Sequence, residues 1–485
     1  RGRARAHRKA LGEWQCQVRR PNKFQSDQST LSVFADKLLI EWTQILYPHQ
    51  RTVPLSARNV IGAKLEGDGK TRFVRVHVLT TPQEYSPEGV SEHEVYDLTE
   101  FANSVEAESC RESIQKMAAS VRPGDGEGFM YMIVNPVSGH RLGETIYQKI
   151  KPWFDLAEIQ IQGPNGPGQA LLTTHAGHAA EFIKSVDFTN CCGIVCIGGD
   201  GTVCEVLNGI MKRSDHDQVL EDVPIGAIPA GSECALAKMV GYVNPTSSAY
   251  IILKGHKIRP IDVLKIRQAK KGVVMYSICG VGWGLAGKLA EESESLRAAY
   301  GPARYLVSGV KSFLNLRGCP GTLEVWQPPD AEQGPAKKKH EECMFGTNCA
   351  VCLEGEKNKK NQDAVGKMLS VKGPFVVVAM LKSEKALAPY VHLSDGYVDV
   401  LAVPEVSRLE LLMRSTKILT SSHIADGQCL YWKTRRVVLR PESTSDKINV
   451  DGEVLDGEVT EIDVLPAALR VFSAFEESQQ KKKYV

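Results

Sequence analysis

A short glycine-rich stretch holds the first side chain that suggests a chemical role. The segment CIGGDGTVCEVLNG, residues 196–209, places Asp200 where an apolar run ends and a helical pattern begins. Glycines let the backbone approach a ligand without Cβ clashes, and the free N–H groups of a helix N-terminus can seat a phosphate. A carboxylate repels a phosphate unless it holds a metal or takes a proton. Asp200 is therefore a candidate general base for phosphoryl transfer to a hydroxyl, and the alternative is a helix N-cap.

The elements around Asp200 repeat a simple pattern. Between residues 128 and 260, FMYMIVN precedes PVSGHRLG, CCGIVCI precedes GGDG, and VPIGAI precedes PAGS. Uninterrupted apolar strands that alternate with helices predict a doubly wound parallel α/β domain for nucleotide binding. Ligands of such sheets bind beyond the carboxyl ends of the strands, so the three glycine turns should meet at one edge. The sequence contains no GxxxxGK[ST] or HRD motif, which excludes those two nucleotide-binding classes.

Two other regions flank this domain. Residues 25–120 contain short strands followed by one helical pattern, which predicts a small β-barrel with a C-terminal helix. Residues 261–475 are dominated by strands, with a helical stretch at 286–316, and predict an antiparallel β-rich domain of the sandwich type. A charged, low-complexity insert at 330–365 is expected to be a flexible surface loop. The predicted fold class is therefore α/β plus β.

Composition is that of an ordinary globular protein. Of the 485 residues, 42% are hydrophobic and 24% are charged, and the formal net charge is +2, which does not indicate nucleic acid binding. No apolar run approaches the roughly 20 residues that span a bilayer. The basic tails, 1–24 and 476–485, are expected to be flexible, either simply solvated or weakly attracted to an anionic membrane surface. Thirteen cysteines, mostly within apolar segments, indicate free thiols in a reducing, cytoplasmic setting.

Several motifs, taken in order, resemble those of the diacylglycerol-kinase-type lipid kinases. They are NPVSG at 135, GGDG at 198, IPAGS at 228, GWG at 282, ARYLVSGVKSFL at 303, HLSDGYVDVL at 392 and DGE at 451. The chain is most similar to the ceramide kinase and sphingosine kinase branch, over residues 129–475. The resemblance implies a PH-like domain at residues 25–120, an active site in the cleft between two catalytic domains, and ATP and Mg²⁺ as cofactors.

The resemblance also implies roles at matching positions. Asp200 would be the general base acting on the lipid hydroxyl. Asp451, Gly452 and Glu453 would face the nucleotide from the second domain, directly or through Mg²⁺, although DGE between strands is also ordinary hairpin-turn chemistry. Guanidinium groups suit phosphate oxygens, and a surface ion pair is the alternative for each matching arginine. The remaining nucleotide-lining residues would be Asn135, Ser138, Gly139, Arg141, Gly198, Gly199, Gly201, Thr202, Ser232, Arg297 and Arg304.

Two positions depart from the pattern of the family. Cys234 stands where relatives carry Asn or Asp after the second glycine turn. Lys288 stands where relatives carry the acid that binds the sphingoid lipid. A lysine cannot accept a hydrogen bond, and it would repel a sphingosine ammonium. Glu291 or Glu292 would serve instead if the helix register differs by one turn, so Lys288 and Glu292 are the candidate substrate-binding residues.

A cysteine cluster lies in the predicted insert. The segment HEECMFGTNCAVC contains His340, Cys343, Cys349 and Cys352, and the last two have CxxC spacing. These four residues could form a tetrahedral zinc site. A redox-sensitive thiol group and incidental loop cysteines are the other two interpretations. The resemblance adds that ceramide kinases carry a similar cysteine triplet in a comparable loop.

Together these features predict an ATP- and Mg²⁺-dependent lipid kinase that phosphorylates the primary hydroxyl of ceramide. The expected partners are a ceramide or sphingoid lipid substrate and an anionic membrane surface, with no nucleic acid, and the expected location is cytoplasmic with peripheral membrane association. One rival is a sphingosine kinase. The other is a ceramide-kinase-like lipid-binding protein with weak or no activity, which Cys234 and Lys288 keep open.

Overall fold

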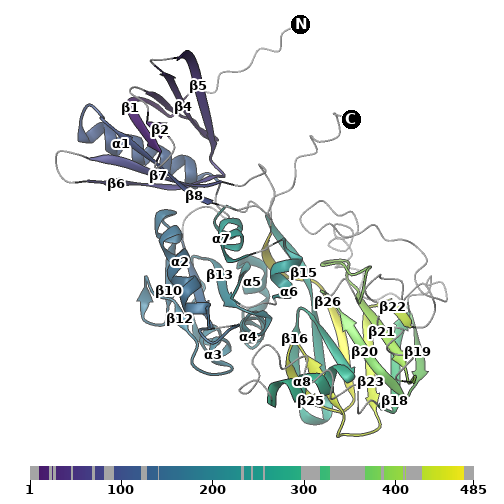
Figure 1. The fold of residues 1–485 in the computed structure, drawn as a ribbon. Helices are drawn as coiled ribbons and strands as arrows, with labels where there is room; N and C mark the ends of the chain where they lie inside the picture. The colour runs from purple at the N-terminus through teal and green to yellow at the C-terminus, as the bar shows by residue number, and fades with distance from the viewer. Residues whose placement is uncertain are drawn as a thin grey trace, which may run out of the picture.

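Three domains follow one another along the chain: a β-rich N-terminal domain, an α/β domain and a β-rich C-terminal domain (Figure 1). The computed structural model describes residues 10–20, 24–25, 29–44, 47–67, 72–80, 92–121, 128–139, 141–230, 234–241, 244–254, 257–295, 317–327, 366–383, 387–407, 410 and 429–473. The predicted insert at 330–365 and the predicted tail at 476–485 lie outside these residues.

The N-terminal domain is an antiparallel eight-stranded sheet with one helix. The strand order is β5-β4-β3-β1-β8-β7-β6, with β2 beside β1, and α1 packs on β6, β1 and β7. Asn103 caps α1, because its Oδ1 accepts the N–H of Glu106 at 2.9 Å. The PH-like barrel stays a prediction. The elements are β1 (Gly12–Arg20), β2 (Phe24–Gln25), β3 (Ser29–Val33), β4 (Lys37–Gln44), β5 (Tyr47–Ser56), β6 (Val60–Glu66), β7 (Phe73–Thr80), β8 (Glu92–Thr99) and α1 (Ser104–Ala119).

Strand β1 corrects the expectation that residues 1–24 form a flexible tail. Within β1, the side chains of Trp14, Cys16 and Val18 are buried and alternate with more exposed polar residues. This period of two is the pattern of a half-buried strand. The strand pairs with β3 and β8 in the middle of the sheet. The tail prediction was wrong for residues 12–20 because the basic residues nearby obscured this alternation.

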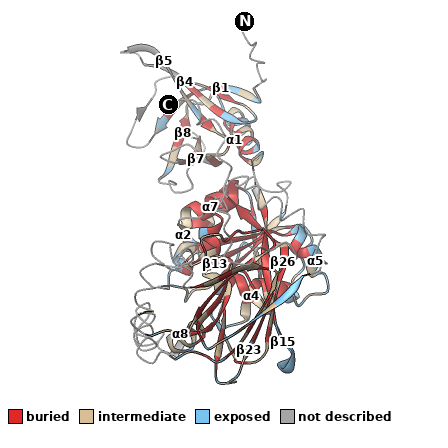
Figure 2. Ribbon diagram, turned by 90° about the vertical axis from the view of Figure 1, so that its right-hand side faces the viewer, coloured by how far each residue is buried: buried red, intermediate tan, exposed pale blue. Residues whose placement is uncertain are grey.

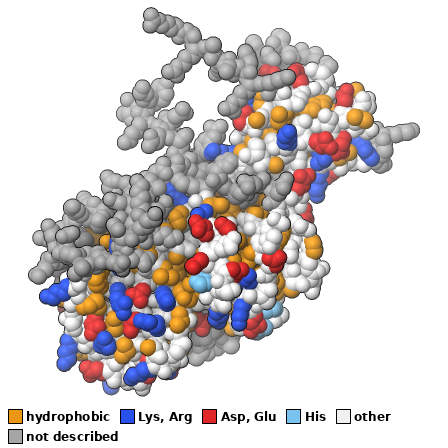
Figure 3. Space-filling model, turned by 180° about the vertical axis from the view of Figure 1, so that it is seen from behind, with side chains coloured by type: hydrophobic (Ala, Val, Ile, Leu, Met, Phe, Trp, Pro, Cys, Tyr) orange, Lys and Arg blue, Asp and Glu red, His pale blue; other side chains and the backbone are white. Residues whose placement is uncertain are grey.

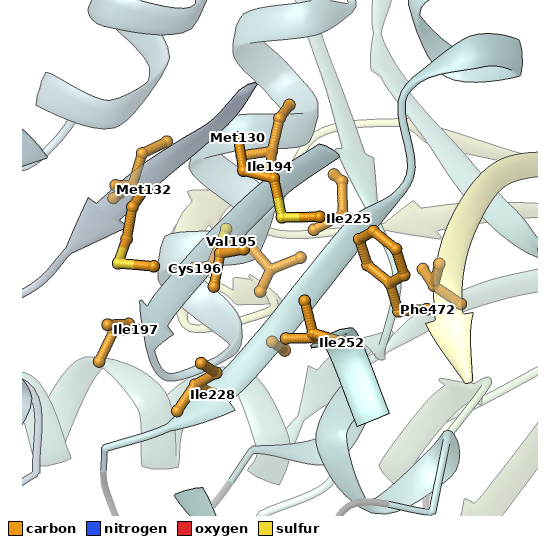
Figure 4. Close-up of a cluster of buried hydrophobic side chains, with 14 of the residues drawn as sticks. Met130, Met132, Ile194, Val195, Cys196, Ile197, Ile225, Ile228, Ile252 and Phe472 are labelled. Carbon is orange, nitrogen blue, oxygen red and sulfur yellow. The ribbon is translucent and has the colours of Figure 1, made fainter. Parts of the chain in front are cut away.

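The α/β domain has the predicted parallel sheet. Strands β10, β9, β13 and β14 lie side by side and parallel, and β26 continues the sheet next to β14. Helices α2 and α7 pack together, as do α3, α4 and α5 (Figure 1). The core between sheet and helices is apolar, with Ile252 of α7 and Phe472 of β26 among its side chains (Figure 4). The elements are β9 (Phe129–Val134), α2 (Gly143–Leu156), β10 (Gln160–Gly163), β11 (Gly166–Pro167), β12 (Leu171–Leu172), α3 (His178–Ser185), β13 (Cys191–Gly198), α4 (Asp200–Ile210), α5 (His216–Asp222), β14 (Ile225–Pro229), α6 (Ala235–Met239), α7 (Pro245–Lys254) and β26 (Thr460–Ser473).

The C-terminal domain is built from antiparallel strands in two sheets. One has the order β22-β21-β20-β17-β24-β25, and the other contains β16, β15, β26, β23, β18 and β19. Side chains from both sheets share one hydrophobic core, as in a sandwich. The elements are β15 (Lys257–Gln268), the 3₁₀ helix η2 (Ala269–Lys271), β16 (Val273–Ser277), β17 (Gly280–Gly284), α8 (Leu285–Ser295), β18 (Gly321–Gln327), β19 (Lys367–Lys372), β20 (Phe375–Leu381), β21 (Val398–Pro404), β22 (Leu430–Thr434), β23 (Arg436–Pro441), β24 (Lys447–Val450) and β25 (Glu453–Asp456).

The boundary between the last two domains differs from the predicted one. The division expected between residues 260 and 261 falls inside β15. That strand pairs along its length with β26, and β26 also pairs with β14 of the α/β domain and with β23 of the C-terminal domain. The last strand therefore belongs to both domains and makes one continuous sheet of them.

A buried charged network ties the HLSDGYVDVL motif to this shared sheet. The Nζ atom of Lys382 lies 2.8 Å from Asp262 Oδ2 and 3.3 Å from Asp395 Oδ1, and Lys433 Nζ lies 2.8 Å from Asp395 and 2.9 Å from Asp399. The two ammonium groups hold the pKa of Asp395 down to about 2 against the effect of burial. Removing one partner from such a network leaves a buried charge uncompensated, which is strongly destabilising.

The exposed surface of the C-terminal domain carries both signs of charge. Basic and acidic side chains are interspersed on the face that Figure 3 shows. Several form cross-strand pairs, such as Arg440 Nε with Glu324 at 2.7 Å and Arg436 with Asp463 at 3.4 Å. Exposed pairs of this kind add little to stability. Among the described helices, none combines the length and apolar character needed to cross a membrane.

The N-terminal domain lies above the α/β domain in Figure 2. Two of its buried side chains, Ile61 and Leu79, belong to the hydrophobic core of the α/β domain. Gln115 of α1 donates from Nε2 to the carbonyl of Leu156 at 2.8 Å and accepts the N–H of Ala63 at 3.0 Å. The fully buried ammonium of Lys254 donates to the carbonyl of Ala118 at 2.6 Å, in the last turn of α1. A cation at a helix C-terminus is favoured by the helix dipole. These contacts join the two domains into one packed unit.

Gln115→Ala should weaken this docking. The change leaves a buried N–H and a buried carbonyl without their partner, and each such group costs about 1–3 kcal/mol. We expect the free energy of unfolding in urea to fall by roughly 2–4 kcal/mol. Glu112→Ala, at an exposed position of the same helix, should change it by less than about 0.5 kcal/mol. Equal effects of the two changes would contradict the docked arrangement.

Candidate active site

Three strand-end turns meet at one edge of the parallel sheet, as the sequence predicted. Strands β9, β13 and β14 end next to one another, with Ile197 beside Val134 and Gly198 beside Pro229. Backbone hydrogen bonds continue into the turns, from Asn135 N to Ile197 O at 2.9 Å and from Ala230 N to Gly198 O at 3.0 Å. The edge where nucleotide phosphates are expected is therefore a single backbone-lined surface.

The first turn is set by its backbone and attached to α4. Asn135 Nδ2 lies 3.4 Å from Thr202 Oγ1, which connects the turn to the first helical turn of α4. Gly139 and Arg141 both adopt positive φ angles, of 58° and 63°. Of the predicted residues here, Asn135 and Ser138 are half-buried, whereas Gly139 and Arg141 are exposed. The exposed pair is accessible to a ligand at this edge.

Two glycines of the GGDG turn serve opposite purposes. A Cβ atom on Gly198 would lie 2.4 Å from Thr202 Oγ1, so this glycine is required by close packing inside the protein. A Cβ atom on Gly201 would have no protein atom within 4 Å, and this glycine is exposed at the start of α4. Gly199 is the N-cap of α4 and offers no side-chain cap. The helix N-terminus therefore opens onto space that a phosphate can enter.

Asp200 caps a helix, but not its own. It is the first residue of α4, and its Oδ2 accepts the N–H of Ala235 at 2.7 Å while its Oδ1 accepts the N–H of Leu236 at 3.0 Å. Both donors belong to the first turn of α6, and the thiol of Cys234 adds a weak contact to Oδ1 at 3.6 Å. The carboxylate thus lies between the N-termini of two helices, where a negative charge is favoured.

Asp451 occupies the DGE turn between β24 and β25 and has a positive φ of 48°. Its Oδ2 accepts from Ile278 N at 3.0 Å and from the Cys204 thiol at 2.8 Å, and its Oδ1 accepts from Gly280 N at 2.9 Å. Burial raises the pKa of Asp451, and these hydrogen bonds oppose the rise. The other predicted residues of the turn, Gly452 and Glu453, are exposed.

The thiols of Cys204 and Cys234 act as hydrogen-bond donors to these carboxylates. Burial raises the pKa of Cys204 and Cys279 well above the usual value, and it also raises that of Cys234. A protonated thiol is neither a nucleophile nor a metal ligand. Within the part of the chain that the structure describes, no group of three or more His, Cys, Asp or Glu residues is arranged to hold a metal ion.

Lys288 and Glu291 lie on α8 of the C-terminal domain. The side chain of Lys288 interacts with the thiol of Cys319, which also interacts with Asp446. Asp446 precedes β24 and Asp451 follows it, so the two are separated by about 16 Å of extended strand. Glu291 is paired with Lys447 at 3.2 Å. Glu292, further along α8, is half-buried.

Several predicted site residues lie outside the part of the chain that the structure describes. They are Ser232, Arg297, Arg304 and the cluster of His340, Cys343, Cys349 and Cys352.

Sequence reasoning missed three further polar side chains of α4. Cys204 contacts Asp451, Glu205 accepts the N–H of Ala179 in the first turn of α3 at 3.3 Å, and Asn208 bonds to the backbone of Tyr276. The spacing of these residues could have identified two of them. Residues 200, 204 and 208 are four apart, so they must share one face of a helix. That face is turned toward other protein elements rather than toward solvent.

Comparisons with known proteins identify the family of this α/β fold. Residues 130–266 match the diacylglycerol kinase catalytic domain, and residues 361–473 match the YegS C-terminal NAD kinase beta sandwich-like domain. Sphingosine kinase 1 of Arabidopsis thaliana is 30% identical, over 67% of this chain and 68% of that protein. Ceramide kinase of Mus musculus is 31% identical, over 58% of this chain and 56% of that protein, and the human ceramide kinase is 30% identical, over 63% and 59%. The chain belongs to the diacylglycerol-kinase-like lipid kinases, with the sphingosine and ceramide kinases as relatives.

Gly201→Ala tests whether this glycine is needed for nucleotide binding rather than for packing within the protein. The new methyl group meets no protein atom, and alanine favours a helix over glycine by up to about 1 kcal/mol. We expect an unchanged or higher thermal midpoint and a dissociation constant for an ATP analogue that rises at least about tenfold. Gly198→Ala is the matched comparison, and it should lower the thermal midpoint because its methyl group collides with Thr202. Unchanged nucleotide affinity in Gly201→Ala would place the nucleotide elsewhere.

Proposed function

We propose that the chain is an ATP- and Mg²⁺-dependent kinase that phosphorylates the primary hydroxyl of a ceramide-like sphingolipid at a membrane surface. The observation that carries the proposal is the position of Asp200, at the N-terminus of α4 and at the edge where three strand-end turns meet. Membership of the lipid kinase family supports phosphoryl transfer as the chemistry.

The hydrogen bonds of Asp200 leave one of its lone pairs free for its proposed role as the general base. A carboxylate offers about four lone-pair sites. Leu236 N and the Cys234 thiol approach Oδ1, and Ala235 N approaches Oδ2. Roughly one site on Oδ2 stays available to accept the proton of a substrate hydroxyl. The backbone donors hold the carboxylate in one orientation, which is the positioning that phosphoryl transfer requires.

The nucleotide would lie against the α4 N-terminus with its phosphates over the glycine turns, where Arg297 and Arg304 are proposed to reach them. Mg²⁺ usually takes one or two protein carboxylates together with substrate phosphates, and it neutralises charge on the transferred group when bound. Among the described residues near the turns, the exposed Glu453 is the carboxylate that would fit this role, since the one open site of Asp200 is assigned to the substrate proton. Membrane approach through the N-terminal domain belongs to the same proposal, and co-sedimentation of the full chain with anionic vesicles tests it.

Two alternatives differ in the lipid or in the activity. A sphingosine kinase would use the same chemistry on a lipid with a free amine, and relatives of both kinds are about equally similar to this chain. A lipid-binding protein with weak or no kinase activity is favoured by Cys234, whose thiol contacts Asp200 where the family pattern has Asn or Asp. Ceramide is preferred here because Lys288 brings a positive charge to α8.

Asp200→Asn tests the base. The amide keeps the shape of the side chain but cannot take the proton, so turnover should fall roughly 10²- to 10⁴-fold with little change in nucleotide affinity. The amide also weakens the cap of α6, at a cost of about 1 kcal/mol. Glu205→Gln is the matched control, because Glu205 caps α3 from the same helix and has no proposed chemical role. If Asp200→Asn lost no more activity than Glu205→Gln, Asp200 would be only a cap.

Lys288→Gln tests the choice of lipid. Two unit charges about 4 Å apart interact by roughly 4 kcal/mol at an intermediate dielectric, and a difference of 1.4 kcal/mol is already about tenfold. Because solvent screens part of the charge, we expect the ratio of kcat/KM for sphingosine to that for ceramide to rise by about tenfold. Lys270→Gln, at a lysine whose side chain is 77% exposed on the β15–β16 turn, should leave the ratio unchanged. Wild-type protein that already prefers sphingosine would contradict the ceramide assignment.

A further inference from the structure

Helix α4 is fastened to the C-terminal domain at two points on one face. Asn208 makes a bidentate contact with the backbone of β16, donating from Nδ2 to Tyr276 O at 2.8 Å and accepting from Tyr276 N at 3.0 Å. Its Nδ2 also lies 2.8 Å from the carbonyl of Cys204. One helical turn earlier, Cys204 donates its thiol proton to Asp451. The same helix begins with Asp200, so both contacts fix the element that carries the proposed base.

Asp451 is the hydrogen-bond acceptor on the C-terminal side of this attachment. Its carboxylate collects Ile278 N and Gly280 N from the turn between β16 and β17, with Cys279 N at 3.5 Å. One side chain therefore joins three segments, α4, the β16–β17 turn and the β24–β25 turn. Both carboxylate oxygens are already turned toward protein donors, in contrast to the exposed Glu453 beside it.

We propose that Asp451, Cys204 and Asn208 are positioning residues that lock α4 onto the C-terminal domain, and that Asp451 does not bind the nucleotide. The lock fixes α4, which begins at Asp200, against β16 and the β16–β17 turn of the C-terminal domain. A misplacement of about 1 Å at a reacting centre can cost roughly 10²-fold in rate, so a polar contact remote from the reacting atoms can matter for turnover. The inference rests on the proposed kinase activity for its effect on turnover.

Asp451→Asn distinguishes between a positioning role of Asp451 and direct binding of the nucleotide. The amide turns one acceptor into a donor that faces backbone N–H groups, so amide hydrogen exchange at Ile278 and Gly280 should speed up about tenfold. We expect kcat for ceramide phosphorylation to fall roughly 10- to 100-fold. The dissociation constant of a non-hydrolysable ATP analogue, measured without lipid, should change by no more than about threefold. Asp456→Asn, in the same hairpin but on an exposed side chain, is the matched control for both readouts.

Substitutions of Cys204 and Asn208 test the other two contacts, by comparing a change that keeps the hydrogen bond with changes that remove it. Cys204→Ser keeps a hydrogen-bond donor and should retain most of kcat and the slow exchange, whereas Cys204→Ala removes the donor and Asn208→Ala removes the contact to β16. Both alanine variants should reproduce the exchange change of Asp451→Asn in the β16–β17 region.

Three outcomes would overturn the proposal. A rise of tenfold or more in the ATP-analogue dissociation constant of Asp451→Asn, with unchanged exchange, would make Asp451 a nucleotide ligand. Faster exchange with unchanged kcat would make the contacts merely structural. Equal effects of Cys204→Ser and Cys204→Ala would show that the hydrogen bond donated by the Cys204 thiol does not help to hold α4. If the wild-type chain phosphorylates no lipid, the proposed function fails, and the exchange and affinity measurements still decide between lock and ligand.

Discussion

The carboxylate of Asp200, held between the N-termini of α4 and α6, is the interaction on which the rest of the site depends. It fixes the start of α4 to the start of α6, since it begins one helix and accepts the first backbone N–H groups of the other. The glycines around it satisfy two demands at once. Gly198 lets Thr202 pack beneath the turn, while Gly201 keeps the helix N-terminus open. An acid is tolerated beside a phosphate edge because two helix dipoles and three donors stabilise its charge.

Packing outside the site supports the same arrangement. Helix α2 begins at Gly143, directly after the first turn, and its other end reaches Leu156, where Gln115 of the N-terminal domain is bonded. The N-terminal domain therefore holds the far end of a helix whose first residues border the phosphate edge. Removing residues 1–120 would expose the buried surface of α2 and α7, including Lys254. Point substitutions are thus better suited than truncation to test membrane approach by this domain.

The local parts of this structure could be predicted from the sequence, and the long-range parts could not. Apolar strands, glycine turns and helices in residues 128–260 are adjacent in the chain, so their pattern predicts both the parallel sheet and the edge. The pairing of β26 with β14 joins Val471 to Ile225, and no periodicity predicts which distant strand completes a sheet. The contact of Asp200 with α6 depends on where two turns meet in space. For Asp451, DGE is consistent with a hairpin, but its backbone partners come from residues far earlier in the chain.

Product analysis after incubation with γ-labelled ATP, Mg²⁺ and vesicles that contain ceramide, sphingosine or diacylglycerol tests the central claim most directly. Mass spectrometry of the extracted lipids locates the transferred group. The account predicts a phosphomonoester on the primary hydroxyl of ceramide, formed faster than any product of the other two lipids. Vesicle binding without a phosphorylated lipid, under conditions in which the chain is folded and binds ATP, would contradict it and would favour a lipid-binding protein without kinase activity.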